Sequence, residues 1–177
     1  MDESVGDEGG FALRQGRVED AGALVDLQLR SWRVAFSHLP VGKVVDDLSP
    51  FELEQVRQHW LAQQQGPEVV WVATAGEQIV GYARTCWWQD TDDLPAATVK
   101  LHALYVDPDV MGKGVGSRLL EQAATTARQV SASGMALWTP QDLERAHRFY
   151  ERHGWRADPR WTKPWRGTLE VRYLRDV

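Results

Sequence analysis

Three glycines at alternate positions separate a β-rich run from a helical pattern, and this junction limits the fold more than any other part of the 177-residue chain. From Thr98 to Val106 most residues are β-branched, aromatic or aliphatic, which is typical of a strand. Asp107-Pro108 then ends the strand. After the glycines, apolar residues recur at three- and four-residue spacing from Leu119 to Val130. We therefore predict a strand, a glycine-rich loop and an amphipathic helix in succession.

The glycine loop, Gly112, Gly114 and Gly116, predicts a site for an anion. The first turn of a helix has unpaired N–H groups and the positive end of the macrodipole, and glycines let the backbone approach a phosphate closely. The spacing weakens two nucleotide motifs. A dinucleotide fingerprint places its third glycine one residue later, and a P-loop needs Ser or Thr after Gly-Lys, whereas Lys113 is followed by Gly114.

Two blocks of the chain resemble the GNAT N-acetyltransferase superfamily. The run Met111-Gly-Lys-Gly-Val-Gly116 resembles its acetyl-CoA loop, in which Gln or Arg usually stands where Met111 is. The run from Ala146 to Trp155 resembles the signature Ala-x-x-Phe-Tyr-x-x-x-Gly-Phe, with Trp155 in place of Phe. Leu143 stands where many members carry Asn. The resemblance extends from about Phe11 to the last residue.

Alternating helices and strands around this junction predict a mixed α/β domain, and the resemblance implies the GNAT fold, with a splayed central strand before the phosphate-loop helix. It also implies acetyl-CoA as co-substrate. The pantetheine arm is expected to pair with the main chain of Leu104, Tyr105 and Val106 as an extra strand would. The residues expected to hold the pyrophosphate, mainly through backbone N–H groups, are Met111, Gly112, Lys113, Gly114, Val115, Gly116 and Ser117.

Acetyl transfer to an amine needs a deprotonated nucleophile, a stabilised oxyanion and an acid for the leaving thiolate. The resemblance implies that backbone N–H groups of Leu104 to Val106 serve the oxyanion. Tyr150 is the candidate acid, with an ordinary pKa near ~10, and a plain core tyrosine is the alternative. His102 is the candidate base because its ordinary pKa is about 6.5, and a hydrogen-bonded structural histidine is the alternative. His147 and His153 are expected to be solvated helix positions.

The segment from Ser31 to Pro40 resembles the part of one GNAT branch in which a first helix bends into a second that walls the acceptor pocket. Trp32, Phe36 and His38 are therefore the candidate acceptor-binding residues. Nine tryptophans are present in the chain. Those at predicted strand ends or in loops, Trp87, Trp88, Trp161 and Trp165, fit an acceptor pocket, an edge strand or the surface of a homodimer. Trp138 is expected in the core.

We expect direct acetyl transfer in a ternary complex, since Cys86 lies outside both motifs. The expected acceptor is the primary amine of a small molecule. Two alternatives stay open: a non-catalytic acetyl-CoA sensor, which Met111 and Leu143 favour, and an enzyme that acetylates protein amino groups. Intact Gly114 and Tyr150 argue against the sensor.

Composition sets the remaining limits. With 43% hydrophobic residues, we expect one domain over residues 11–177 after a disordered tail over residues 1–10. The net charge of −5 and the lack of a basic run argue against nucleic acid and an anionic membrane. One cysteine leaves no disulfide framework and no cysteine-based zinc site, and we expect no metal. Without a spanning run or a leader, we expect a cytoplasmic protein.

The rest of the chain supplies further elements. We expect a helix from about Glu19 to Ala35, a helix over residues 49–65, and a hairpin of two strands over residues 69–75 and 78–88. Thr139 is expected to cap a helix that starts with Pro140 and ends at Gly154. A tryptophan-rich loop is expected over residues 161–165, followed by a last strand over residues 168–175.

Overall fold

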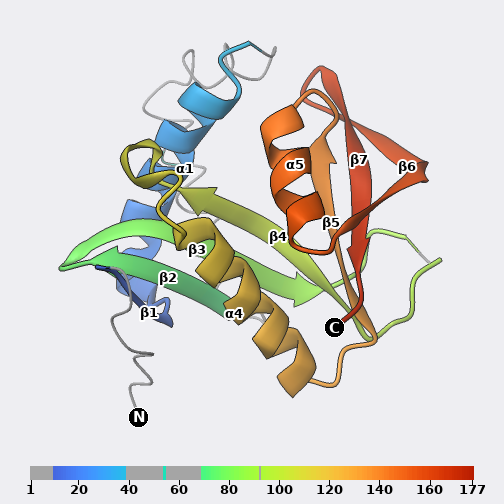
Figure 1. Ribbon diagram of the computed structural model, residues 1–177, viewed down its shortest axis with the longest axis horizontal. Coiled ribbons are helices and arrows are strands. Elements are labelled where there is room, and N and C mark those ends of the chain that lie inside the picture. Colours follow the sequence, from blue (N-terminus) through green and yellow to red (C-terminus); the bar gives the residue numbers. More distant parts are fainter. Residues whose placement is uncertain (1–9, 39–53, 55–68, 92) are drawn as a thin grey trace.

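One seven-stranded sheet, in the order β1-β2-β3-β4-β5-β7-β6, forms the centre of the molecule. The computed structural model describes residues 10–38, 54, 69–91 and 93–177 (Figure 1). The tail expected over residues 1–10 and the helix expected over residues 49–65 lie outside the described residues, except for Gly10 and Glu54. The mixed α/β class predicted from the sequence is confirmed.

The strand and helix limits agree closely with several predictions. The strand over residues 98–106, the hairpin and the last strand all form where expected, and Gly76 turns the hairpin with a φ of +58°. In chain order the elements are β1 (Ala12–Gln15), the 3-10 helix η1 (Val18–Asp20), α1 (Ala21–Ala35), β2 (Val69–Ala75), β3 (Gln78–Trp87), β4 (Thr98–Val106), the 3-10 helix η2 (Pro108–Val110), α4 (Val115–Gln129), β5 (Gly134–Pro140), α5 (Glu144–Arg152), β6 (Arg156–Trp165) and β7 (Thr168–Arg175).

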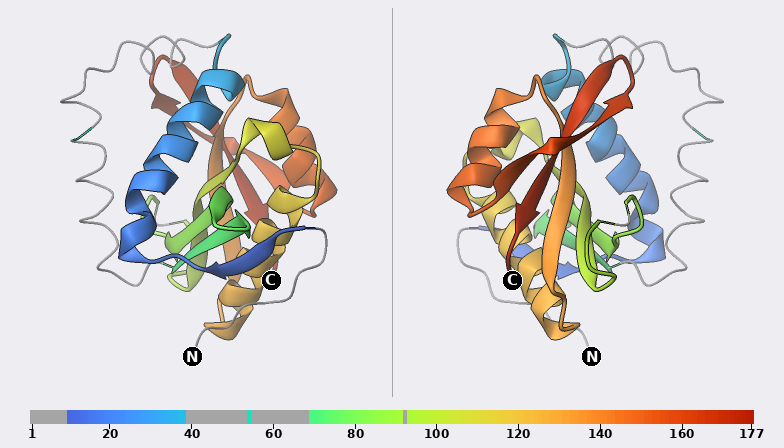
Figure 2. Two further views of the ribbon diagram at one scale, coloured as in Figure 1. Left: turned by 90° about the vertical axis from the view of Figure 1, so that its left-hand side faces the viewer. Right: turned by 90° about the vertical axis from the view of Figure 1, so that its right-hand side faces the viewer.

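Helices cover both faces of the sheet, because its inner strands are apolar on both sides. In β2, Val70 and Val72 pack with α1, whereas the alternate residues Trp71 and Ala73 pack with α4. Successive side chains of a strand point to opposite faces, so one apolar run contributes to two cores. Figure 2 shows α1 on one side of the sheet and α4 with α5 on the other.

The sheet opens between β4 and β5. These strands are parallel, and their register covers only Thr98 to Lys100 of β4 against Gly134 to Ala136 of β5. All other neighbouring strands are antiparallel. From Leu101 onward, β4 therefore continues beside β3 without a strand partner on its other edge. This opening is the splay that the sequence predicted.

A β-bulge at His102 changes which face of the sheet the β4 side chains meet. Arg84 of β3 is opposite Ala103 and Thr85 is opposite Leu101, so His102 is the extra residue on β4. Leu101 before the bulge and Leu104 after it both pack on the α4 side of the sheet. In a regular strand, residues three positions apart such as these would lie on opposite faces.

Two predictions about the second half of the chain were wrong. Thr139 does not cap a helix: it lies in β5 opposite Val171 of β7, and α5 begins later, at Glu144, with no side-chain cap. The expected tryptophan-rich loop is the end of β6, in which Trp165 lies opposite Thr168 of β7. Pairing with β7 overrides local capping and loop preferences in both places.

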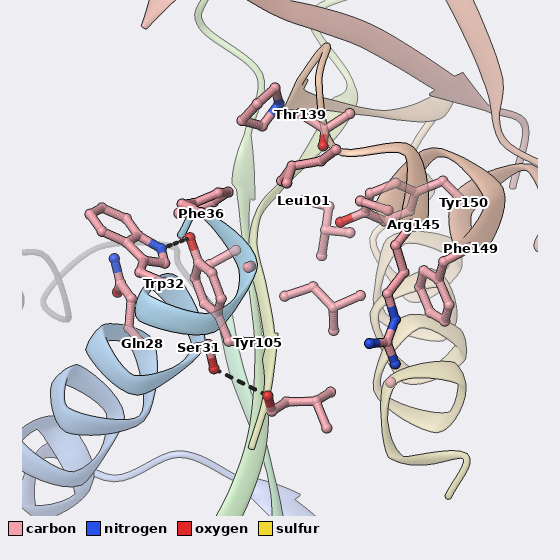
Figure 3. Close-up of a pocket in the computed structure, with 18 of the residues that line it drawn as sticks. Gln28, Ser31, Trp32, Phe36, Leu101, Tyr105, Thr139, Arg145, Phe149 and Tyr150 are labelled. Atoms are coloured by element: carbon pink, nitrogen blue, oxygen red, sulfur yellow. Dashed lines mark hydrogen bonds between the residues drawn. The ribbon is translucent and has the colours of Figure 1, made fainter. Parts of the chain in front are cut away.

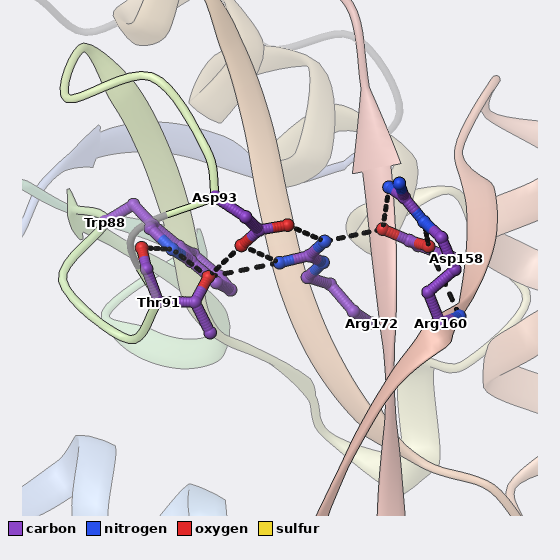
Figure 4. Close-up of polar contacts among 6 residues, drawn as sticks. All are labelled: Trp88, Thr91, Asp93, Asp158, Arg160 and Arg172. Carbon is purple, nitrogen blue, oxygen red and sulfur yellow. Dashed lines mark hydrogen bonds and ion pairs between the residues drawn. The ribbon is translucent and has the colours of Figure 1, made fainter.

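The C-terminal strands are fixed to the β3–β4 loop by a buried arginine. Arg172 of β7 has no exposed side-chain surface, and its Nη2 lies 2.6 Å from the Asp93 carboxylate and 2.5 Å from that of Asp158 on β6. Figure 4 shows Arg172 between Asp93 and Asp158. Its guanidinium carbon also lies 5.9 Å from the centre of the Trp88 ring and 5.1 Å from that of Trp161. These two tryptophans therefore pack around a structural ion pair.

Candidate active site

A cavity of about 1510 Å³ fills the opening between β4 and β5. Its wall includes residues of α1, β4, the loop before α4, α5 and the β6–β7 hairpin. Figure 3 shows Trp32 of α1 facing Phe149 and Tyr150 of α5 across this space. The cavity exceeds the ~300–1,000 Å³ typical of a site for one small molecule, so it has room for two substrates at once.

The glycine loop at one end of the cavity has the backbone geometry of an anion site. Gly112 and Gly114 have φ angles of +83° and +86°, in the left-handed region that favours glycine. Gly114 is the N-cap of α4 and no side chain bonds to the first-turn N–H groups, which therefore stay available to a ligand. Gly116 is helical, and a Cβ there would lie 3.4 Å from Val106 and 3.5 Å from Phe149. Gly116 therefore allows the start of α4 to pack closely against Val106 and Phe149.

All the residues predicted to hold acetyl-CoA line this cavity except Lys113. The Lys113 side chain is exposed and borders a separate small cavity that Phe11 and Val80 also line. Arg145 of α5, which the sequence analysis did not consider, does line the main cavity, and Figure 3 shows its guanidinium beside Phe149.

The edge of β4 offers main-chain groups to an extended ligand. Leu104, Tyr105 and Val106 lie beyond the short pairing with β5 and line the cavity. Ser31 of α1 donates a hydrogen bond of 3.1 Å to the Val106 carbonyl (Figure 3), which holds the end of the strand in place. An unpaired edge of this kind is a template for one more extended chain.

Tyr150 is partly buried and lines the cavity from α5. Its ring packs against Phe149, Trp155 and Tyr173, with centroid distances of 5.5, 5.9 and 6.2 Å. Figure 3 shows its hydroxyl pointing away from α5 toward β4. Burial raises the pKa of Tyr150 above its ordinary value of 10, so the phenol stays protonated at neutral pH. This geometry suits a proton donor better than a fully packed core residue.

His102 lies at the bulge of β4 with an exposed side chain that lines the cavity. The surrounding protein nonetheless desolvates the ring, and together with the nearby charges of Arg84 and Lys100 this lowers the pKa of His102 to about 4. The imidazole is therefore neutral at neutral pH. Its pKa lies well below the value near 6.5 that the sequence analysis assumed, so it is a much weaker base than expected.

The candidate acceptor-binding residues form an aromatic wall. Trp32 lies edge-on to Phe36 and to Trp165 of β6, each with a centroid distance of 5.8 Å, and its Nε1 donates a hydrogen bond of 2.7 Å to the Tyr105 hydroxyl. Of the tryptophans that fitted either a pocket or a surface, Trp165 belongs to this wall. His38 lines the rim and is exposed, with Nε2 3.5 Å from the Asp142 carbonyl.

A cluster of charges, which sequence reasoning missed, adjoins this end of the cavity. The Asp90 carboxylate accepts hydrogen bonds from Lys100 at 2.7 Å and from Trp138 Nε1 at 2.6 Å, and lies 3.4 Å from Lys163. Burial tends to raise the pKa of Asp90, but the two lysines outweigh it and the pKa is lowered. Trp138 is half-buried and lines the cavity, so the prediction that it lies in the core was wrong.

The other two helix histidines are not solvated as expected. His153 is partly buried, and its Nε2 lies 3.0 Å from Ser117 Oγ at the start of α4. His147 is also partly buried, with Nε2 2.9 Å from the Pro140 carbonyl. Both residues therefore help to hold α5 against its neighbours, and only His153 lines the cavity.

Among the described residues, no group of three or more His, Cys, Asp or Glu side chains is arranged to hold a metal ion. The helices within that part of the chain are all too short or too polar to cross a bilayer.

Comparison with known proteins identifies the class that this fold and cavity represent. The model of the Acetyltransferase (GNAT) family matches residues 24–155, which span β4, the glycine loop and α5. The chain therefore belongs to the GNAT acetyltransferase family, as the two sequence blocks predicted. No curated protein sequence matches the chain.

Solved structures share the fold at low sequence identity. The PaiA N-acetyltransferase of Thermoplasma acidophilum, in complex with coenzyme A, has a TM-score of 0.68 and 15% identity over 94% of this chain and 99% of that one. YncA of Salmonella typhimurium, a putative acetyltransferase with acetyl-CoA, has a TM-score of 0.70 and 17% identity over 94% of both chains. A ribosomal-protein-alanine N-acetyltransferase of Brucella melitensis has a TM-score of 0.70 and 17% identity over 93% and 99%.

Proposed function

We propose that this protein transfers the acetyl group of acetyl-CoA to the primary amine of a small molecule, by direct attack in a ternary complex. One observation carries the proposal: a single cavity joins the glycine loop to the aromatic wall through the opening between β4 and β5. Two structures of the same fold contain coenzyme A or acetyl-CoA, which supports acetyl-CoA as the co-substrate.

The chain's own groups divide the work along this cavity. The loop at Gly114 and the first turn of α4 hold the pyrophosphate through backbone N–H groups. Main-chain groups from Leu104 to Val106 orient the extended arm, and their N–H groups donate hydrogen bonds to the negative charge that develops on the carbonyl oxygen. Tyr150 donates its proton to the leaving sulfur. When bound, acetyl-CoA supplies the activated acetyl group.

Direct transfer is favoured because the cavity wall offers no cysteine. Cys86, the sole cysteine of the sequence, is half-buried in β3 and does not line the cavity. A small acceptor is favoured because Trp32, Phe36 and Trp165 confine the space beyond β4 with packed rings. A protein acceptor would need an open groove at that end.

Thiol release from acetyl-CoA tests the function directly. The purified protein is assayed against small amines, polyamines, amino acids and basic peptides. We expect release that depends on one small-amine class. Release with peptides alone would point to a protein acetyltransferase, and acetyl-CoA binding without release would point to a sensor. Absence of acetyl-CoA binding would refute the assignment of the loop.

A further inference from the structure

Glu170 of β7 is a buried carboxylate in the cavity wall that the mechanism above does not use. Among the described residues, the carboxylates that line the cavity are Asp142, Glu144 and Glu170. The first two are exposed, whereas Glu170 is only 8% exposed. It lies opposite Pro140 of β5, the strand that borders the opening, at the end that holds the aromatic wall. Buried charged groups are rare, so its position calls for a reason.

Three charged groups from neighbouring elements act on Glu170, and Tyr105 also lies near it. Lys163 of β6 has its Nζ 3.6 Å from the carboxylate, Lys100 and Tyr105 approach from β4, and Asp90 approaches from the loop after β3. The two lysines favour the ionised form. Burial disfavours it more strongly, and the net result is that the pKa of Glu170 is raised above its ordinary value of 4.5.

Glu170 is the better proton acceptor of the two candidates in this cavity. A general base works best when its pKa lies near the working pH. Burial and two cations move the pKa of His102 down to about 4, whereas burial raises that of Glu170 above its ordinary value. Burial thus makes the imidazole a weaker base, and the carboxylate a stronger base, than either group is in water.

Lys163 is placed so that Glu170 can lose its charge at little cost. Its Nζ also lies 3.4 Å from Asp90 and 4.6 Å from the centre of the Trp138 ring. When Glu170 takes up a proton, Lys163 keeps a carboxylate and an aromatic face as partners. A buried ion pair with no second partner would leave an uncompensated charge after the same step.

We propose that Glu170 is the catalytic base that takes the proton from the acceptor ammonium. The inference rests on the proposed function and names the residue that completes it. The N–H bond of the ammonium breaks and its proton binds Glu170. The freed nitrogen lone pair forms the C–N bond to the acetyl carbon while the C–S bond breaks. The sulfur takes the Tyr150 proton, and the new amide loses its extra proton to the phenolate.

The test compares Glu170→Gln with the wild type on two acceptors of similar shape. Benzylamine is protonated at neutral pH, whereas O-benzylhydroxylamine is neutral and needs no base to free its lone pair. If the panel above favours another amine, that amine and its aminooxy analogue replace this pair. We expect kcat/KM for the protonated amine to fall about 100-fold or more, and for the neutral analogue to fall only a few-fold. In the variant the low-pH limb of the kcat/KM profile for the protonated amine should move up toward the pKa of the amine itself, because only the free amine can then attack.

Two controls separate chemistry from folding. Glu77→Gln makes the same change at an exposed position in the β2–β3 turn, away from the cavity, and should keep the wild-type rate. Glu170→Asp keeps the carboxylate and should recover part of the rate for the protonated amine. Equal losses with both acceptors, or an unchanged pH profile in Glu170→Gln, would overturn the assignment of the base alone. Absence of thiol release by the wild type with every amine would instead overturn the proposed function.

Discussion

Burial raises the pKa of Tyr150 and lowers that of His102, so neither group titrates where its residue type would place it. Both residues line the cavity from elements that meet only in the fold, β4 and α5. The sequence motif found the positions, because the Phe-Tyr block and the β-rich run are local patterns. It could not find the pKa values, which depend on neighbours distant in the chain such as Arg84.

Removing the Tyr150 hydroxyl is expected to slow turnover without weakening acetyl-CoA binding. Tyr150→Phe keeps the ring contacts and removes only the proton donor, so we expect kcat to fall about 100-fold with little change in the Kd of acetyl-CoA. Steady-state kinetics and calorimetry measure the two quantities. Tyr173→Phe is the matched control, because Tyr173 lies outside the cavity and its hydroxyl bonds to Glu151 at 3.1 Å. Wild-type kcat in Tyr150→Phe would exclude the proton-donor role.

The pKa of His102 can be measured directly. Titration of the histidine ring signals by NMR should give a midpoint near 4 for His102, assigned by comparison with His102→Gln. The cause is desolvation with added repulsion from Arg84 and Lys100, so Lys100→Met should move the midpoint upward. A wild-type midpoint near 6.5 would show that the ring is solvated as in a peptide.

At the scale of single elements, local signals predicted most of the fold. The strand before the loop, the hairpin around Gly76 and the last strand form at the expected residues, because β-branched runs and turn residues act locally. The failures, at Thr139 and at Trp165, lie where β7 pairs with strands on both sides. Which strands pair with β7 depends on the whole sheet and not on the local sequence.

The glycine loop offers a matched pair of substitutions. Gly114 and Gly76 both have positive φ angles and both leave the space around a new Cβ empty, so either substitution strains the backbone by a similar amount, about 1–2 kcal/mol. Only Gly114 lines the cavity. We expect Gly114→Asp to abolish acetyl-CoA binding and Gly76→Asp to retain it, with similar losses of thermal stability. Calorimetric titration and thermal unfolding would measure both effects. Retained binding in Gly114→Asp would show that the pyrophosphate lies elsewhere.

At the scale of the whole molecule, the cavity is assembled from segments that are far apart in the sequence. Glu170 and Lys163 come from the last hairpin, Lys100 from the central strand, and Arg145 from α5. Periodicity predicts which face of an element is buried, but it carries no information about which distant charges meet. The charged half of the candidate site was therefore beyond prediction from sequence, whereas the glycine loop was not.

The buried arginine that joins β7 to the β3–β4 loop should control global stability. Arg172→Met leaves the buried Asp158 without one of its two cations, and breaking such a pair costs about 3–5 kcal/mol. Urea unfolding measures this loss. Adding Asp158→Asn removes the stranded charge, so the double variant should be more stable than Arg172→Met alone. A double variant that is no more stable would mean that packing between Trp88 and Trp161 dominates.

The same cluster predicts how stability depends on pH. The pKa of Asp158 is lowered to about 2, first by the hydrogen bond from Arg160 and then by Arg172, against about 3.9 in an unfolded chain. The stabilisation is therefore complete above pH ~4 and lost as the pH falls toward 2. Arg172→Met raises this pKa toward its ordinary value, so we expect a shallower fall in unfolding free energy between pH 4 and 2, measured by urea titration at each pH. An identical slope in both proteins would contradict the assignment.

The bulge at His102 shifts the pairing of β4 with β3 by one residue. Because residue 102 is left out of the pairing, Leu104 meets α4, and Tyr105 meets α1 and Trp32. Replacing His102 keeps the residue count, so the aromatic wall survives any side chain there. Deleting it would restore regular pairing with β3 and leave Leu104 and Tyr105 on their present faces, whereas drawing His102 into regular pairing would turn both side chains to the opposite faces. The faces that these side chains meet therefore depend on residue 102 staying outside the pairing, and not on its imidazole.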